Sequence, residues 1–582
     1  MSIFLNIKKS IFLLTQNGFK KNIIMFVLFS FIMASLEYLS IGIFIPILKF
    51  ILVDFDVSFG IFDLNISKIN KNEVIFFSFA LIFLIFFIRF LFSIFFINYK
   101  NKIIYNINLK FSRKLFSKYL YEDYSFHLKK NSSELITMMN EVLGFSTGAI
   151  YYLSSLFIDL VITFFIIVLL FQFEFIGTIS MLLLFSLFFF IYYFYYNKKI
   201  REIGKNRVIY NNKRLKFLQE SFSGIKELII YNVRKVFEER LDKIHSFFFS
   251  LSLKERKIEF LPRIFLEFIT LIFFIILTLI LYLIGKENES ILVTISIFAM
   301  AGFKLMPCVS RILNSTQNLR SRIFAVNKIY DELIFQNEND FFNGVDNDKQ
   351  SIEKLKFNDS IFFKNITFRY NKESKYIFEN LSLKILKGSS VGIYGKSGSG
   401  KSSFVDLLSG FSYAESGSIL IDNQPLNNYN RLNWYKNIAY VPQNYQILDD
   451  SIYNNIIFGN SLINDEKIVN KKIKDILDQL DLTEVVENLP LKVHTRIGEG
   501  GISLSGGQRQ RVVLARALFK ESDVIILDES TNALDSITEK EIIDSILSIQ
   551  NKTVIIISHK LNSIKNCRNL LMFENQKINQ IR

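Results

Sequence analysis

The chain reads Gly395-Lys396-Ser397-Gly398-Ser399-Gly400-Lys401-Ser402, which fits the phosphate-binding pattern G-x-x-x-x-G-K-[ST] at every position. The preceding residues 390–394 predict a short buried strand, and residues 403–408 predict a helix. Glycines let backbone N–H groups wrap a phosphate, and the N-terminus of the following helix adds its positive end. We therefore expect a phosphate-binding loop in which Lys401 neutralises the β- and γ-phosphates and Ser402 holds Mg²⁺. An ordinary glycine-rich turn can also match such a pattern, so the rest of the chain must decide.

The composition favours a membrane protein with several domains. The chain has 582 residues, half of them hydrophobic, with 63 phenylalanines and a net charge of +15. Because the positive charge accompanies long apolar runs, a membrane is a better explanation for it than nucleic acid. Cys308 and Cys567 lie too far apart to indicate a disulfide framework, and the four histidines are too scattered to indicate a zinc site.

Six segments are long and apolar enough for bilayer-spanning helices, which need about 20 predominantly apolar residues. They are roughly 23–50, 74–99, 145–171, 175–197, 264–285 and 290–313. Only Gln172-Phe173-Glu174 separates the third segment from the fourth, which predicts a tight helical hairpin. The first run begins after Lys20-Lys21 and is too long for a cleavable signal peptide, so we expect none.

Basic residues predict the topology. The 100–142 connection holds eight Lys or Arg and the 198–263 connection holds seventeen, whereas the opposite connections hold only Lys68 and Lys71, then none, then Lys286. The positive-inside rule therefore places both termini and both basic connections in the cytoplasm. Near-helical spacing of apolar residues, as in 215–230, predicts helices that run beyond the membrane with a break at Gly224. Basic surface helices that only hold the topology would explain the charge but not the length.

The apolar runs end after about residue 314, and an Asn- and Asp-rich stretch predicts a linker. From roughly 355 on, short β-rich runs alternate with amphipathic helices, which is typical of an α/β nucleotide-binding domain. We expect a multi-domain chain: an all-α six-helix transmembrane domain over 1–335, a linker over 336–354 and an α/β P-loop domain over 355–582.

A second element of nucleotide chemistry is a buried strand with an acidic end, Val524-Ile525-Ile526-Leu527-Asp528-Glu529. One carboxylate can hold Mg²⁺ while the other activates the attacking water, so we assign Asp528 to the first role and Glu529 to the second. Any strand can end in Asp-Glu. That alternative weakens because Leu504-Ser505-Gly506-Gly507-Gln508 stands a short way upstream and leads into a basic helix over 509–518.

With these motifs the C-terminal domain resembles the ATPase domain of ABC transporters, whose signature matches 504–508. The resemblance implies that this pentapeptide closes over nucleotide held by the phosphate loop of an opposite ATPase domain. It assigns Tyr370 to adenine stacking, Gln443 to Mg²⁺ sensing, Asp535 to communication between the sites and His559 to the γ-phosphate switch. Residues 495–500 resemble the segment with which exporters touch the inner-loop tips. Two positions depart from the usual pattern, Asn532 for Ser and Lys560 for Arg, and neither change removes a catalytic group.

The resemblance implies ATP and Mg²⁺ as cofactors and three overlapping groups of site residues. The catalytic group is Glu529, His559 and Gln443, and the Mg²⁺ group is Ser402, Gln443 and Asp528. The nucleotide-binding group is Tyr370, Gly395, Lys396, Ser397, Gly398, Ser399, Gly400, Lys401, Ser402, Ser403, Gln443, Asp528, Ser505, Gly506, Gly507 and Gln508. Six spans before one ATPase domain match the exporter-type half-transporter. One phosphate loop and one signature per chain imply a homodimer with two equivalent sites.

Charged residues inside membrane spans are costly and are candidates for function. Arg89 and Lys304 lie about fifteen and fourteen residues from the outer ends of their spans, so they share a depth in the inner half of the bilayer. Arg311 follows Lys304 by seven residues on one helix face, and Arg263 lies near the inner boundary of the fifth span. These four residues predict a cationic track suited to a phosphate-bearing substrate.

Three of these cations also have a named structural alternative. Arg89 can pair with Glu37, Arg263 can pair with Glu267 one turn on, and Arg311 can snorkel to the interface.

A narrower resemblance runs along nearly the whole chain. Glu37 through Pro46, 261–267 and 294–307 resemble the flippases for lipid-linked oligosaccharides of bacterial protein glycosylation and related surface-glycan pathways. It implies a polyprenyl-pyrophosphate-linked glycan, moved through the lipid of the bacterial inner membrane from the cytoplasmic to the periplasmic side, and no nucleic-acid partner. Exporters of another lipid, a drug or a peptide are alternatives, the last disfavoured because no cysteine-protease domain precedes the first span. An ATP-gated channel or a regulatory subunit is a further alternative, disfavoured by the intact Glu529 and signature.

Overall fold

The computed structural model describes residues 2–44, 71–334, 353–371, 373–396, 398–459, 465–498, 501–502, 504–531, 535–574 and 577–581. The chain divides into two compact units, which are Met1–Glu122 with Phe126–Asp340, and Asp123–Ser125 with Phe341–Arg582. Several positions named above lie outside the described residues: 45–50 of the first span, most of the linker (336–352), Ser397, Glu499, Gly500 and Asn532.

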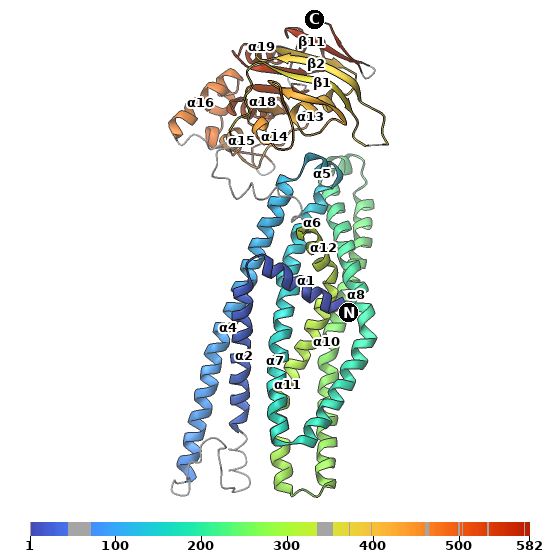
Figure 1. Cartoon of the computed structure of the whole chain (residues 1–582), viewed down its shortest axis with the longest axis vertical. Helices are drawn as coiled ribbons and strands as arrows, with labels where there is room; N and C mark the ends of the chain where they lie inside the picture. Colours follow the sequence, from blue (N-terminus) through green and yellow to red (C-terminus); the bar gives the residue numbers. More distant parts are fainter. Residues whose placement is uncertain are drawn as a thin grey trace. The chain divides into compact units, whose positions relative to one another are not determined.

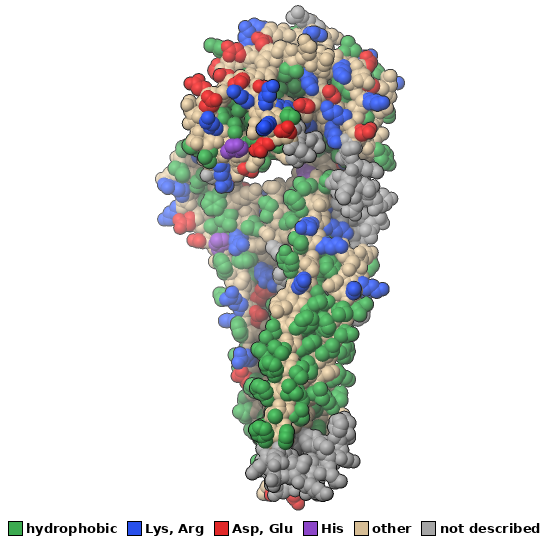
Figure 2. Space-filling model, turned by 90° about the vertical axis from the view of Figure 1, so that its left-hand side faces the viewer, with side chains coloured by type: hydrophobic (Ala, Val, Ile, Leu, Met, Phe, Trp, Pro, Cys, Tyr) green, Lys and Arg blue, Asp and Glu red, His purple; other side chains and the backbone are tan. Residues whose placement is uncertain are grey.

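In the described residues of the first unit, the regular elements are all helices (Figure 1). In chain order the elements are α1 (Ser2–Gln16), α2 (Lys20–Gly42), α4 (Lys71–Tyr121), α5 (Tyr124–Lys129), α6 (Ser132–Leu143), the π-helical η2 (Gly144–Ile150), α7 (Tyr151–Phe173), α8 (Phe175–Ser223), α9 (Ile225–Ile230), α10 (Arg234–Leu283), α11 (Asn288–Ser321) and α12 (Ile323–Ile334). Among the described residues, six helices are long and apolar enough to cross a membrane, which agrees with the six predicted spans. On the face shown in Figure 2, a broad field of hydrophobic side chains covers the lower part of this unit.

Three of these helices are far longer than a membrane crossing. Helices α4, α8 and α10 contain 51, 49 and 50 residues, or about 75 Å each, against a hydrocarbon core of about 30 Å. The prediction that the basic connections continue as helices is therefore confirmed, and α8 ends where expected, with Gly224 as its C-cap. Glu174 alone joins α7 to α8, and Lys286 Nζ donates to its carboxylate at 2.7 Å.

Close packing holds the helices of this unit together. Ala34, Ile166, Leu277 and Phe298 are fully or almost fully buried in one cluster that joins α2, α7, α10 and α11. Helix α8 approaches α11 so closely at Gly204 that a Cβ there would lie 2.2 Å from the carbonyl oxygen of Ser321. Only glycine fits that contact.

The second unit is an α/β domain. Its strands are β1 (Ser360–Phe368), β2 (Phe378–Leu386), β3 (Ser390–Gly395), β4 (Ser416–Ile421), β5 (Gln424–Pro425), β6 (Ile438–Val441), β7 (Asp450–Ser451), β8 (Arg496–Ile497), β9 (Val524–Asp528), β10 (Thr553–Ile557), β11 (Asn569–Glu574) and β12 (Lys577–Gln580). Its helices are α13 (Lys401–Ser409), α14 (Arg431–Tyr435), α15 (Ile452–Ile457), α16 (Glu466–Gln479), α17 (Thr483–Glu487), the 3₁₀ turn η4 (Lys492–His494), α18 (Gly506–Phe519), α19 (Ser536–Leu547) and α20 (Leu561–Ile564).

The order of the strands positions the site. The six-stranded sheet runs β12-β11-β3-β10-β9-β6, and its strands from β11 to β6 are parallel. Carboxyl ends of parallel strands meet at one edge of a sheet, where ligands bind in such folds. The phosphate loop follows β3, Glu529 follows β9 and His559 follows β10, so all three reach this edge. A separate antiparallel sheet has the order β2-β1-β4-β5.

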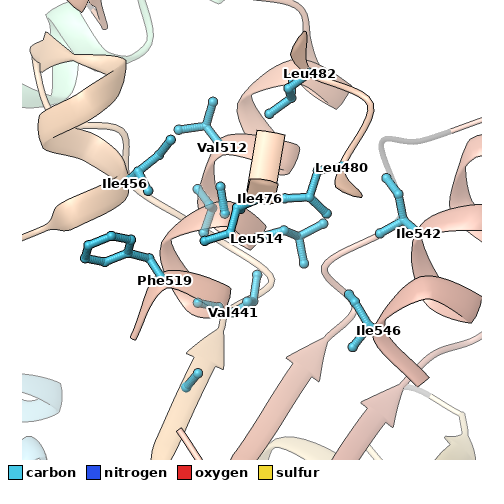
Figure 3. Packing of buried hydrophobic residues seen from close by; sticks show 14 of the residues in the cluster. Val441, Ile456, Ile476, Leu480, Leu482, Val512, Leu514, Phe519, Ile542 and Ile546 are labelled. Carbon is cyan, nitrogen blue, oxygen red and sulfur yellow. The ribbon is translucent and has the colours of Figure 1, made fainter. Parts of the chain in front are cut away.

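Two hydrophobic clusters hold the flanking helices against the strands. In one cluster the ring of Phe404 of α13 stacks on Phe363 of β1 and meets Phe573 of β11 edge to face, with ring centroids 4.7 and 5.5 Å apart. Figure 3 shows part of the other cluster, in which residues of α18 lie near the end of β6 and residues of α19 lie farther to the right; it includes Val441, Val512, Leu514, Phe519, Ile542 and Ile546. This packing fixes α18, which carries the signature residues at its N-terminus.

Candidate functional site

The phosphate loop connects β3 directly to α13. Gly400 is the N-cap of α13 and has φ of +101°, a conformation that side chains other than glycine's rarely adopt. A Cβ on Gly395 would lie 2.6 Å from the carbonyl oxygen of Phe573, and one on Gly400 would lie 3.0 Å from Ile377. The buried side chains of α13, such as Phe404, anchor the helix behind the loop. The glycines of the sequence pattern are therefore needed for both space and backbone geometry.

Lys401 folds back over this loop. Its Nζ donates to the carbonyl oxygens of Gly395 at 2.7 Å and Lys396 at 2.9 Å. Burial lowers the pKa of Lys401 from its ordinary value, while Glu529 and Asp528 act in the opposite direction. Ser399 Oγ is buried and has no hydrogen-bond partner among the described residues. An ammonium group and an unmatched hydroxyl beside a helix N-terminus are the groups that a phosphate would satisfy, so the loop fits nucleotide phosphates.

Glu529 is held in an unusual backbone conformation. Its φ is +47°, which is uncommon outside glycine and is typical of functional sites. The backbone N–H of Glu529 donates to Ile557 at 3.0 Å, which anchors the residue to the end of β10. One carboxylate oxygen accepts from Gln443 Nε2 at 2.8 Å, and the other lies 2.5 Å from His559 Nε2. The carboxylate is thus buried and aimed by two neighbours, as the general-base assignment requires.

His559 joins the base to the phosphate loop. Its Nδ1 lies 3.2 Å from the carbonyl oxygen of Gly395, while its Nε2 faces Glu529. Both ring nitrogens therefore face oxygen atoms. The structure therefore brings the three predicted catalytic residues, Gln443, Glu529 and His559, to one edge of the sheet.

Asp528 ends β9 beside the base and is also buried. Its carboxylate accepts a hydrogen bond from the Tyr440 hydroxyl of β6 at 3.2 Å, a contact that the sequence did not indicate. Burial raises the pKa of Asp528, and the Tyr440 hydrogen bond works against that rise. Among the described residues no group of three or more His, Cys, Asp or Glu side chains could hold a metal by itself. One carboxylate with Ser402, which is exposed on the first turn of α13, suits Mg²⁺, which takes few protein ligands and completes its shell with phosphates and water.

Tyr370 lies beside α13. Its hydroxyl donates to Asp406 of that helix at 2.6 Å, and its ring packs edge-on against Phe368 at 5.0 Å. Burial raises the pKa of both Tyr370 and Asp406. Ser403 is buried on the first turn of the same helix. The hydroxyl end of Tyr370 is fixed while part of its ring stays exposed, which suits an adenine-stacking role.

The signature residues cap their own helix. Ser505 Oγ accepts from the backbone N–H of Gln508 at 3.2 Å, and the Gln508 side chain accepts from the backbone N–H of Ser505 at 2.8 Å. This capping box leaves Gly506 and Gly507 in the first turn of α18. Asp535 likewise caps α19 by accepting from the backbone N–H groups of Ile537 and Thr538. The role of the signature over the nucleotide of a second chain stays a prediction.

In the helical unit, Arg89 and Lys304 share one carboxylate. Arg89 of α4 forms an ion pair with Glu37 of α2, and Lys304 of α11 lies 3.8 Å from the other oxygen of Glu37. Glu37 is buried. The anticipated pairing of Arg89 with Glu37 is therefore present. Because Lys304 lies beside the same carboxylate, two of the candidate substrate-binding cations, Arg89 and Lys304, are close together.

Arg311 pairs with a carboxylate on another helix. Its Nε and Nη2 donate to the carboxylate of Asp159 on α7 at 2.7–3.1 Å, in a two-pronged contact between residues 152 positions apart. Lys100 of α4 lies 3.5 Å from Ser155, one turn from Asp159. Arg263 pairs with Glu267 at 3.2 Å within its own helix, as the structural alternative predicted. Sequence reasoning missed Asp159 and Lys100, although a lone carboxylate in an apolar span is a detectable signal.

Two family models cover most of the chain. Residues 23–303 match the ABC transporter transmembrane region, and residues 378–532 match the ABC transporter ATPase domain. The chain belongs to the ABC transporters. The second unit is accordingly an ABC ATPase domain, and the nucleotide and metal of such domains are ATP and Mg²⁺. With six apolar helices, this ABC transporter is a multi-pass inner-membrane protein with its ATPase domain in the cytoplasm.

Similar proteins support the same architecture. The solved structure of a bacterial Atm1-family ABC exporter with ATP bound has a TM-score of 0.75 and 19% identity, covering 96% of this transporter and 94% of that chain. An ATP-dependent lipid A-core flippase of Idiomarina loihiensis is 37% identical over 38% of this chain, and one of Vibrio cholerae is 28% identical over 66%. A putative export ATP-binding/permease protein of Rickettsia typhi is 39% identical over 38%. These alignments span 37%, 64% and 38% of the respective relatives.

Proposed function

We propose that the protein is an ATP-driven lipid flippase that moves a polyprenyl-pyrophosphate-linked oligosaccharide from the cytoplasmic to the periplasmic side of the inner membrane. The names of the lipid A-core flippases among its relatives support lipid movement as the general activity. A homodimer is part of the proposal, because each chain has one phosphate loop and one signature.

The observation that carries the choice of cargo is an excess of positive charge inside the apolar helices. Among the described residues of the apolar spans, Arg89 and Lys304 lie around the carboxylate of Glu37, and Arg311 pairs with Asp159. Lys100, the first residue of the predicted cytoplasmic connection, also interacts electrostatically with Asp159. Among the described residues, three cations of the spans against two carboxylates leave an excess of one positive charge. An uncompensated charge in a membrane is costly, so the arrangement favours an anionic ligand that completes the pairing. A pyrophosphate supplies several charged oxygens for such pairing.

The two carboxylates would hold the cations until the substrate arrives. The side chain of Arg311 is 53% exposed in the single chain, whereas that of Asp159 is 4% exposed. Arg311 can thus reach a ligand while its partner stays fixed. Arg263 is 73% exposed and paired within α10, so we give it a smaller part in binding.

The second candidate cargo is a lipid A-core, favoured by the names of the relatives. An exporter of a drug, peptide or other lipid, and a channel or regulatory subunit without transport, are the remaining alternatives. The proposal is tested with purified protein in proteoliposomes that contain, separately, a fluorescent polyprenyl-pyrophosphate glycan, a lipid A-core and an ordinary phospholipid. ATP-dependent movement of the glycan alone is the expected result. Equal movement of the phospholipid would contradict the cargo, and ATP hydrolysis with no movement of any lipid would contradict the flippase itself.

The charge cluster is tested in the same vesicles. The triple variant Arg89→Gln, Lys304→Gln and Glu37→Gln removes two cations without leaving the buried Glu37 unpaired. We expect it to lose at least tenfold in glycan movement and to retain basal ATP hydrolysis. Lys216→Gln, an exposed cation with an i,i+4 partner, is the matched control. Wild-type glycan movement by the triple variant would remove the cluster from the proposal.

A further inference from the structure

The two loops that carry the base and the switch histidine are also joined by a buried glutamate, Glu539. Glu539 lies in the first turn of α19 and is 4% exposed. One of its carboxylate oxygens accepts from the Thr531 hydroxyl at 2.7 Å and the Ser563 hydroxyl at 2.8 Å. The other oxygen accepts from Lys560 Nζ at 3.2 Å. Three donors from two segments, Thr531 after β9 and Lys560 with Ser563 after β10, therefore converge on one carboxylate.

The positions of these donors along the chain connect them to catalysis. Thr531 is two residues after the base Glu529, and Lys560 is one residue after His559. Strands β9 and β10, which precede these residues, are parallel neighbours in register, with Asp528 opposite Ile557. On the nucleotide side the two loops are joined by the 2.5 Å contact between Glu529 and His559. Glu539 connects the same two loops a second time, because it accepts hydrogen bonds from Thr531 of one loop and Lys560 of the other.

We propose that Glu539 is a positioning residue for ATP hydrolysis, which holds Glu529 and His559 in mutual alignment by tying Thr531 to Lys560. Besides the backbone hydrogen bond from Glu529 to Ile557, the Glu529–His559 contact is a single side-chain connection, and a second side-chain connection through Glu539 restricts the relative motion of the two loops further. Glu529 needs such support because its left-handed backbone conformation is intrinsically unfavourable. Lys560, which stands where arginine is usual, forms the ion pair of this connection, with its Nζ 3.2 Å from the Glu539 carboxylate. The proposal concerns ATP hydrolysis alone and is independent of which lipid is carried.

The test compares Glu539→Gln with Glu541→Gln, which changes an exposed glutamate of the same helix. Glutamine keeps one acceptor for the hydroxyls but presents an amide to Lys560. We expect the kcat for ATP hydrolysis in detergent, without lipid substrate, to fall about 10- to 100-fold. Binding of ATP in the absence of hydrolysis should stay within about threefold, because the phosphate loop and Tyr370 are untouched. The control variant should behave as wild type in both measurements.

Variants of Lys560 keep the proposal testable if Glu539→Gln does not fold. Lys560 is half-exposed, so Lys560→Met should fold and lower kcat about 3- to 10-fold, and Lys560→Arg should restore it. In the double variant Glu539→Gln with Lys560→Met, the losses should be less than multiplicative, because both changes break one connection. A kcat within twofold of the Glu541→Gln control in either single variant would overturn the proposal. An equal loss of nucleotide binding and thermal stability would also overturn it, since that pattern indicates a purely structural role.

Discussion

The ion pair between Arg311 and Asp159 predicts that substitution of Arg311 destabilises the fold more than substitution of Asp159. Arg311→Met leaves a carboxylate that is 4% exposed without its main cation. Removing one partner of a buried ion pair lowers the free energy of unfolding by about 3–5 kcal/mol. Lys100 lies near Asp159 and partly compensates its charge, so we expect Arg311→Met to lower the free energy of unfolding by about 2–3 kcal/mol. Asp159→Asn leaves a guanidinium that is 53% exposed and can be solvated, so its cost should be about 1 kcal/mol or less.

Thermal unfolding in detergent measures this asymmetry. Both cysteines are buried, so a thiol-reactive dye used on a Cys567→Ser background reports the opening of the helical unit at Cys308. At about 2 °C per kcal/mol, Arg311→Met should lower the midpoint by about 4–6 °C and Asp159→Asn by about 2 °C or less. Scan rates must match, because unfolding of such proteins is commonly irreversible. Arg263→Met, whose ion pair is exposed, is the control and should shift the midpoint by less than about 1 °C. The reasoning fails if Asp159→Asn is as destabilising as Arg311→Met.

Three further outcomes follow from the geometry. Glu529→Gln should lower steady-state ATP hydrolysis at least about 100-fold while a filter assay still detects bound ATP; near-normal turnover would show that the base is another residue. Tyr440→Phe removes the hydrogen bond to Asp528, so half-maximal ATP hydrolysis should need about 3–10 times more Mg²⁺. The affinity for Mn²⁺ in the presence of ATP, measured by electron paramagnetic resonance, should fall in parallel. Gly204→Ala forces a methyl group against the backbone of Ser321, which should cost about 1–3 kcal/mol and lower the unfolding midpoint; an unchanged midpoint would mean that α8 and α11 separate easily.

Local chemistry determined what could be read from the sequence alone. A phosphate loop needs glycines at fixed spacing because its backbone N–H groups must turn toward one phosphate. Gly395 has no room for a Cβ, and Gly400 has a φ of +101° that other residues rarely adopt. Membrane spans are likewise local, since each must satisfy its own backbone hydrogen bonds within about 20 apolar residues. The break at Gly224 and the capping box from Ser505 to Gln508 depend on neighbours three or four positions away. For these features the sequence was sufficient.

The tertiary structure alone decided which distant charges meet. Arg311 and Asp159 are separated by 152 positions, and nothing in the pattern of either span specifies that α11 faces α7 at that level. Glu37 was anticipated as a partner for Arg89, but its second contact with Lys304 depends on the packing of three helices. The same holds for Glu539, whose three donors become neighbours only once β9 and β10 lie side by side. Pairing of buried charges is decided by the packing of helices and strands, because the same residues in other arrangements would face lipid, water or different partners.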